Sequence, residues 1–133
     1  MEWTGSILVV DDDPETRDMV VALLREEGLD ARSVASVDEA LEALRRESFE
    51  AILSDIQMPA KDGFTLLSEV RLHWNSIPVV LMTSFGSEET ADEARAAGAF
   101  DCLLKPFAGP LLLETVHRAL EARAPLEDSV SCR

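Results

Sequence analysis

Cysteine is scarce in this sequence, and long apolar runs are absent. The two cysteines, Cys102 and Cys132, cannot build the disulfide framework of a small secreted domain, so we expect a reducing setting and Cys102 as a small core residue. No apolar run approaches the roughly 20 residues that cross a membrane. The first residues also lack the basic and apolar regions of a signal peptide. We therefore expect a cytoplasmic protein.

Positive charge is also in short supply. The chain has 12 Lys and Arg residues against 26 Asp and Glu residues, a formal net charge of −14. Nucleic acid and anionic lipid are repelled by such a surface, so we expect no direct contact with either. Surplus acidic residues usually form solvated helix faces, but they also suit a bound cation or a basic partner.

The chain length fits one domain with one core. Apolar, β-branched runs alternate with amphipathic helical patterns, and the runs lie at residues 6–10, 31–34, 51–54, 78–82 and 102–104. This alternation predicts a doubly wound α/β fold, in which a five-stranded parallel sheet is covered on both faces by five helices. We assign residues 1–123 to this domain and the charged, unpatterned residues 124–133 to a C-terminal tail or the start of a linker.

Helix starts are marked by capping residues. Asp13 precedes Pro14, Ser36 and Glu39 have capping-box spacing, and Ser87 can cap a fourth helix. The first helix should bury an apolar stripe made of Met19, Val20, Leu23 and Leu24. The fourth should bury only small side chains and be loosely held: Thr90, Ala91, Ala94 and Ala97.

Polar residues stand where the predicted strands end. They are Asp11, Asp12, Asp55, Thr83, Ser84 and Lys105. The carboxyl ends of parallel strands share one edge of a sheet, where open α/β proteins keep their sites. A nucleotide-binding loop would need glycines and free N–H groups after the first strand, and this loop offers carboxylates and Pro14 instead. Taken alone, Asp55 would be a turn cap, Thr83 a strand-end cap and Lys105 a solvated lysine.

Carboxylates that meet at this edge must be neutralised. A pair about 5 Å apart repels by roughly 3 kcal/mol at an effective dielectric near 20. A raised pKa is one solution, and a hard divalent cation such as Mg²⁺ is the other. A carboxylate, Mg²⁺, a hydroxyl and an ammonium are the groups that phosphoryl transfer needs, with an aspartyl phosphate as the product.

These motifs give the chain a resemblance to the receiver domain of bacterial two-component response regulators, the CheY-like family. The resemblance covers about residues 5–123. The matching segments, in chain order, are 9–13, 54–59 with 62–63, 82–84, and 98–99 ahead of 104–107. It implies the strand order 2-1-3-4-5.

Residue roles follow from the same resemblance. Asp55 is similar to the phosphoacceptor, and Asp12, Asp55 and the backbone carbonyl of Gln57 resemble the metal ligands. Asp11 resembles a second acid that acts through water. Thr83, with Ser84 beside it, resembles the hydroxyl that moves onto the phosphoryl group. Lys105 resembles the family's cation, and the Lys105–Pro106 peptide is expected to be cis.

The sequence departs from the family pattern at Cys102. The family commonly has Tyr or Phe there, and its ring moves when the threonine does, which a thiol is too small to reproduce. Gln57 and Phe85 occupy the positions that flank the acyl phosphate. A bulky Phe85 would hinder the attacking water, so we expect slow self-dephosphorylation.

The expected function is a signalling switch that catalyses only its own phosphorylation and dephosphorylation. A sensor histidine kinase or phosphotransfer domain would be the donor. The change around Thr83, the helix after Ser87, Cys102 and the last helix would control an output partner or domain. The chain could also dimerise through its last two helices. Two alternatives remain open, an Mg²⁺-dependent aspartyl-phosphate phosphatase or phosphotransferase and a phosphorylation-independent interaction module.

Overall fold

A computed structural model of the chain describes residues 5–84 and 88–131. Five strands alternate with five helices over this length. The elements, in chain order, are β1 (Ser6–Val10), α1 (Pro14–Glu26), β2 (Asp30–Val34), α2 (Val37–Arg46), β3 (Ala51–Asp55), α3 (Gly63–His73), β4 (Val79–Thr83), α4 (Glu88–Ala96), β5 (Asp101–Leu104) and α5 (Gly109–Ser131).

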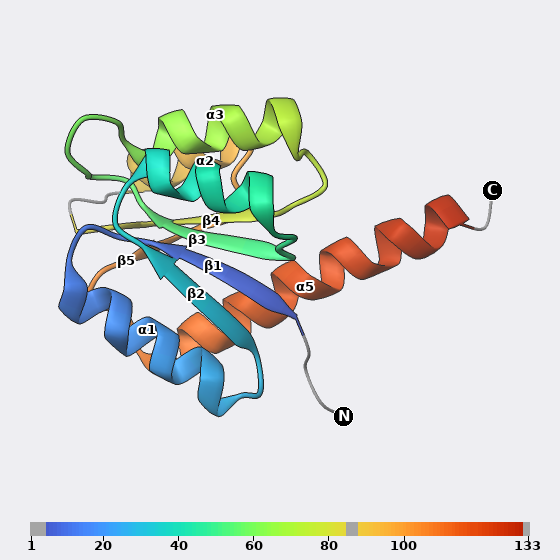
Figure 1. The fold of residues 1–133 in the computed structure, drawn as a ribbon, viewed down its shortest axis with the longest axis horizontal. Helices are drawn as coiled ribbons and strands as arrows, with labels where there is room; N and C mark the ends of the chain where they lie inside the picture. Colours follow the sequence, from blue (N-terminus) through green and yellow to red (C-terminus); the bar gives the residue numbers. More distant parts are fainter. Residues whose placement is uncertain (1–4, 85–87, 132–133) are drawn as a thin grey trace.

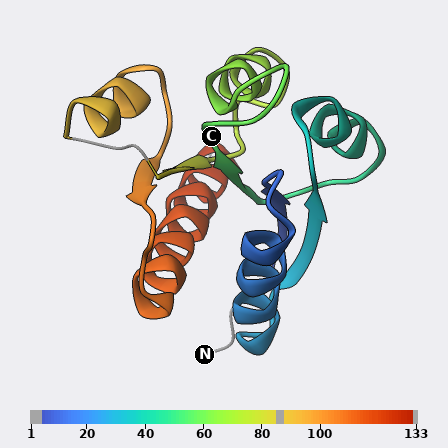
Figure 2. The same ribbon diagram turned by 90° about the vertical axis from the view of Figure 1, so that its left-hand side faces the viewer.

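The strands form one parallel sheet in the order β2-β1-β3-β4-β5, which confirms the predicted fold and strand order. Helices α2, α3 and α4 cover one face, and α1 and α5 cover the other (Figures 1 and 2). The three central strands, β1, β3 and β4, are therefore buried on both faces. This burial explains why their sequences are continuous apolar runs rather than alternating ones.

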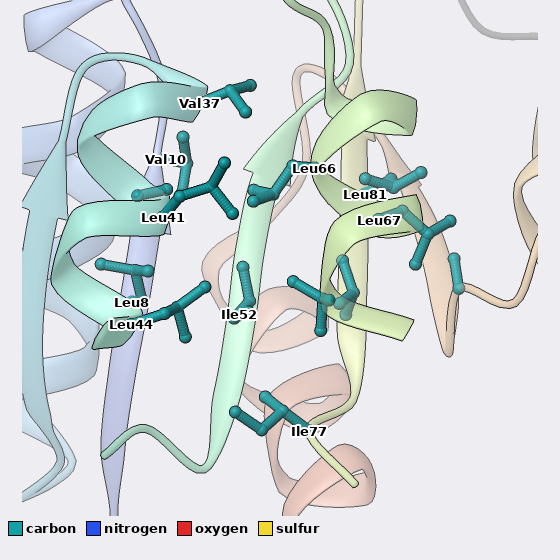
Figure 3. Close-up of a cluster of buried hydrophobic side chains, with 14 of the residues drawn as sticks. Leu8, Val10, Val37, Leu41, Leu44, Ile52, Leu66, Leu67, Ile77 and Leu81 are labelled. Atoms are coloured by element: carbon teal, nitrogen blue, oxygen red, sulfur yellow. The ribbon is translucent and has the colours of Figure 1, made fainter. Parts of the chain in front are cut away.

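Each face of the sheet has its own buried cluster. Figure 3 shows the cluster beneath α2 and α3, where Leu44 of α2 points toward Ile52 of β3 and Leu41 of α2 points toward Leu66 of α3. The cluster on the opposite face joins α1 and α5 to the sheet and includes Leu24 and Leu112. Burial of each such side chain contributes about 1.5–3 kcal/mol. The ends of the central strands are therefore held by a packed core on both sides.

Capping residues fix where the helices begin. Ser36 accepts a hydrogen bond from the Glu39 backbone N–H at 3.2 Å, and the Glu39 carboxylate accepts one from the Ala35 N–H at 2.9 Å. Asp62 caps α3 by accepting a hydrogen bond from the Thr65 N–H at 3.0 Å. These contacts confirm the predicted capping box and satisfy N–H groups that have no partner within a helix.

The prediction is wrong for two residues expected on buried helix faces. Met19 is 46% exposed rather than buried, because it lines a surface groove beside Lys105 and Phe107. Ala97 is also exposed, and it lies in the turn that follows α4. Ala94 is fully buried and Ala91 is half-buried, so α4 attaches through very little apolar surface, as the sequence predicts.

The helix α5 continues to Ser131, so most of the expected tail is helical and extends past the sheet (Figure 1). Whether residues 124–133 start a linker stays a prediction. The cap expected at Ser87, the role expected of Phe85 and the tail position of Cys132 lie outside the described residues. Among the described residues, no helix is long and apolar enough to cross a membrane.

Candidate phosphoacceptor and metal site

Three carboxylates meet at the carboxyl edge of the sheet. Asp11 and Asp12 follow β1, and Asp55 is the last residue of β3. The two strands are paired in parallel with Val10 beside Ser54, so Asp11 and Asp55 reach the same level. One oxygen from each of the three acids lies within 4.8 Å of the others. The sequence-predicted cluster therefore forms, because the strand register brings distant residues to one point.

Lys105 brings positive charge into this cluster. Its Nζ atom lies 2.8 Å from Oδ2 of Asp11 and 3.1 Å from Oδ2 of Asp55, and it donates a hydrogen bond to each. Lys105 follows β5, and its backbone N–H donates to the Thr83 carbonyl at 2.8 Å. The Lys105–Pro106 peptide bond is cis, the geometry that the resemblance implies.

The loop after β1 holds Asp11 in place. Asp11 is fully buried, and its Oδ1 accepts a hydrogen bond from the Asp13 N–H at 2.9 Å. The guanidinium of Arg17 donates to the Asp11 carbonyl at 2.9 Å. Sequence reasoning missed Arg17, although a helix that starts at Pro14 places this residue in its first turn, next to the loop. The orientation of Asp11 is therefore fixed by the Asp13 N–H and Arg17 as well as by Lys105.

The environment shifts the pKa values of Asp55 and Lys105. Burial raises the pKa of the Asp55 carboxyl, as does the charge of Asp11, and these effects exceed the opposing effect of Lys105. Burial on its own would lower the pKa of Lys105, but the hydrogen bonds and charges of Asp11 and Asp55 raise it overall. Lys105 therefore remains an ammonium at neutral pH.

The donor set fits a hard divalent cation. Three carboxylates and one ammonium leave two negative charges unbalanced, and every side-chain donor in the three acids is an oxygen. Asp12 is exposed and Asp55 is 6% exposed, so the cluster is open to solvent on the Asp12 side. Mg²⁺ prefers one or two carboxylates and retains several waters, which an exposed site permits.

Thr83 and Gln57 are joined beside the acids. Thr83 ends β4 and is fully buried, and its hydroxyl donates a hydrogen bond to Oε1 of Gln57 at 3.0 Å. The Gln57 N–H donates to Oδ1 of Asp55 at 3.2 Å. Ser84 follows Thr83 and is exposed. The family resemblance implies that the backbone carbonyl of Gln57 is a metal ligand, and no sequence pattern indicates that its side chain binds Thr83.

Cys102 lies away from the acids, in the core beneath α3 and α4. It is 8% exposed and pairs with Leu81 in the sheet. Leu81 precedes Thr83 by two residues on β4, so Cys102 lies on the same face of the sheet as Thr83. Burial raises the pKa of its thiol, Arg95 lowers it to a smaller extent, and Asp101 raises it further. Cys102 is thus the small core residue that the sequence predicts.

A groove of about 510 Å³ opens next to Lys105. Half-exposed Met19 contributes to it, which explains why this methionine is not part of the core. The lining residues are Thr16, Met19, Ser84, Lys105, Pro106 and Phe107.

Known proteins resemble this chain in sequence. Residues 7–117 match the family model described as the response regulator receiver domain. The response regulator protein PilR of Pseudomonas aeruginosa is 40% identical over 118 residues, which make up 89% of this chain and 26% of PilR.

Solved structures agree. NtrX from Brucella abortus superposes with a TM-score of 0.93 at 33% identity, over 98% of this chain and 30% of that one. The chemotaxis response regulator CheY4 of Vibrio cholerae superposes with a TM-score of 0.82 at 33% identity, over 89% of this chain and 100% of that one.

The chain spans about a quarter of the length of the curated relatives that it matches, and the match falls on one part of them. The family model covers residues 7–117 of this chain, which include the acids and the lysine at the edge of the sheet. The chain therefore belongs to the receiver domain family of two-component response regulators.

Proposed function

We propose that the domain is a phosphorylation-operated switch, in which Asp55 accepts a phosphoryl group from the phosphohistidine of a sensor histidine kinase or phosphotransfer domain. The observation that carries the proposal is the meeting of three carboxylates with the Lys105 ammonium at one edge of the sheet. Asp55 is the central member, because it lies between the Asp11 side and the Thr83 side of this edge.

The transfer forms one bond and breaks one. A carboxylate oxygen of Asp55 attacks the phosphorus while the bond from phosphorus to the donor's imidazole nitrogen breaks. The bonding electron pair stays with the imidazole, which takes up a proton from water. Lys105, which already contacts Asp55, then contacts a phosphoryl oxygen and offsets the charge that develops there.

We assign the metal to Asp11, Asp12, Asp55 and the backbone carbonyl of Gln57, with Asp11 acting through water. Mg²⁺ bound there would neutralise charge on the phosphoryl oxygens. The residues of the chain orient the carboxylates. The Asp13 N–H and Arg17 orient Asp11, and the Gln57 N–H orients Asp55 through its Oδ1.

Thr83 transmits the change at phosphorylated Asp55 to the rest of the domain. A phosphoryl group on Asp55 adds close to two negative charges and strong acceptors, and the Thr83 hydroxyl is the neighbouring donor on β4. Ser84 follows it on the same loop. The weakly attached helix α4 packs on this side through Ala94, so a small change at Thr83 meets little resistance there. Cys102 packs in the same cluster without the ring that the family commonly has.

We expect two kinds of partner protein. The groove beside Lys105 gives a phosphodonor access, and its apolar lining suits a helical domain of a kinase or phosphotransfer protein. A downstream effector or output domain would contact the α4 side, and the last two helices are a candidate homodimer surface. The surplus negative charge disfavours direct contact with nucleic acid or membrane, and we place the domain in the cytoplasm.

The enzymatic alternative lacks support. A phosphatase or phosphotransferase that acts through an aspartyl phosphate needs a general acid close to the nucleophile, two residues further along the chain. That position holds Gln57, whose amide cannot donate a proton to a leaving group and binds Thr83 instead. A phosphate-independent module would not need the buried Asp11–Lys105–Asp55 arrangement.

Incubation with a small phosphodonor, followed by intact mass measurement, tests the proposal. The wild type should gain one phosphoryl group only when Mg²⁺ is present, and Asp55→Ala should gain none. Equal gain by both proteins, or gain without a divalent cation, would refute it. Turnover of a phosphorylated metabolite at catalytic rates would favour the enzyme.

A further inference from the structure

Gln57 contacts two residues of the site with different groups. Its backbone N–H donates to Asp55, and its side-chain Oε1 accepts a hydrogen bond from Thr83 at 3.0 Å. Thr83 is fully buried on β4, whereas Gln57 is exposed on the loop after β3. The amide of an exposed residue is therefore a partner of a buried hydroxyl that the proposed switch has to use.

The chemistry of the hydroxyl makes these two uses exclusive. A threonine hydroxyl has a single O–H to donate. A phosphoryl group at neutral pH presents mainly acceptor oxygens, so Thr83 must donate to it. Thr83 cannot donate the same O–H to Oε1 of Gln57, and the bond seen in this structure has to break first.

We propose that Gln57 is a positioning residue that holds the Thr83 hydroxyl in the unphosphorylated state and releases it when Asp55 carries a phosphoryl group. This inference rests on the proposed function. The bond contributes to the stability of the unphosphorylated arrangement only, so it shifts the equilibrium of the switch toward that arrangement.

Two features of the fold favour this role. Thr83 lies on the same sheet face as Leu81 and Cys102, where the small thiol provides no ring that could restrain the hydroxyl. β3 and β4 are neighbours, with Asp55 beside Met82, so Gln57 and Thr83 lie at the same edge without distortion of either strand.

The expected effect is modest and measurable. A neutral hydrogen bond that is made in one state only shifts an equilibrium by about fivefold, which corresponds to about 1 kcal/mol. Gln57→Met keeps the length of the side chain and the backbone carbonyl but removes the amide acceptor. It should therefore favour the state in which Thr83 is released.

Beryllofluoride with Mg²⁺ serves as the probe, because it mimics a phosphoryl group on a carboxylate. Gln57→Met should bind it about fivefold more tightly than the wild type, with unchanged affinity for Mg²⁺ alone. The NMR signal of the Thr83 methyl group in free Gln57→Met should shift toward its position in the beryllofluoride-bound wild type. Asn75→Ala, which removes an exposed amide at the opposite edge of the sheet, should match the wild type.

A double-mutant cycle separates positioning from a general effect on the fold. Thr83→Val removes the hydroxyl at constant shape, and in this background Gln57→Met should leave the beryllofluoride affinity unchanged. Equal affinities of Gln57→Met and wild type, weaker binding, or the same gain in the Thr83→Val background would overturn the inference. Absence of binding to the wild type, or binding that survives Asp55→Ala, would instead overturn the proposed function.

Discussion

Lys105 and Asp55 are separated by 50 positions in the sequence, yet Nζ of Lys105 lies 3.1 Å from Oδ2 of Asp55. The contact spans the sheet edge from β5 to β3. Lys105 also binds Asp11, so one ammonium is shared by two carboxylates and neither acid is fully neutralised. The remaining negative charge favours binding of a cation at this site.

Mg²⁺ should stabilise the domain. A ligand that binds only the folded state adds about 2.7 kcal/mol at one hundred times its Kd. We expect thermal unfolding of the wild type to shift upward by several degrees in Mg²⁺, and that of Asp12→Ala to shift much less. Asp18→Ala, which removes an exposed acid from the middle of α1, is the matched control and should respond like the wild type. An equal shift in Asp12→Ala would show that Mg²⁺ binds elsewhere.

Stability without a divalent cation should depend on pH through Asp55. Burial raises the pKa of this carboxyl in the folded state, so the folded state holds the proton more strongly than the unfolded state does. The resulting stabilisation is fully present below the unfolded pKa of about 3.9 and is lost as pH rises through the higher folded pKa.

Asp55→Asn should therefore be more stable than the wild type at pH 7 in EDTA, and the difference should shrink toward acid pH. Urea titrations across that range measure it. A constant difference would contradict the assigned pKa direction, and a less stable Asp55→Asn would show that the ion pair with Lys105 outweighs burial.

Lys105→Met should separate metal binding from phosphoryl transfer. Removal of the ammonium leaves the carboxylates without their cation, so Mg²⁺ affinity should rise at least severalfold. Phosphorylation by a small phosphodonor should slow by at least tenfold, because a contact that stabilises the developing charge is lost. Isothermal titration and time-resolved mass measurement provide the two values. Unchanged transfer would remove Lys105 from the mechanism.

The Cys102 thiol should react slowly in the folded protein. Burial raises its pKa, so little thiolate forms near neutral pH, and 8% exposure limits access. In a Cys132→Ser background, iodoacetamide should label Cys102 slowly at pH 7 and rapidly once urea unfolds the chain. Labelling in the folded state at the rate of a free thiol would contradict the position of Cys102 in the core.

The sequence predicts the sheet and the acid cluster well, for a physical reason. The apolar runs mark buried strands, and the polar residues Asp11, Asp55 and Thr83 mark where these strands end. The pattern therefore locates the strand ends to within a residue. The parallel topology then requires these ends to share one edge. Lys105 follows from the same rule applied to β5.

Other features depend on three-dimensional details that no local pattern encodes. Met19 fits an apolar helical stripe, but the folded chain places it at a surface groove rather than in the core. Residues 124–133 show no helical pattern in the sequence, whereas α5 continues to Ser131. The Gln57–Thr83 bond joins a loop amide to a strand end 26 residues away, and long flexible side chains such as Gln57 and Arg17 leave no periodic signal.

Mapping of the modified residue tests the central claim most directly. Borohydride reduces an aspartyl phosphate to homoserine, so the protein is treated with a small phosphodonor, with or without Mg²⁺, reduced and sequenced by tandem mass spectrometry. The account predicts homoserine at position 55 alone, and only in the samples that contained Mg²⁺. Homoserine at Asp11 or Asp12, or at no position although the protein gained a phosphoryl group, would contradict it.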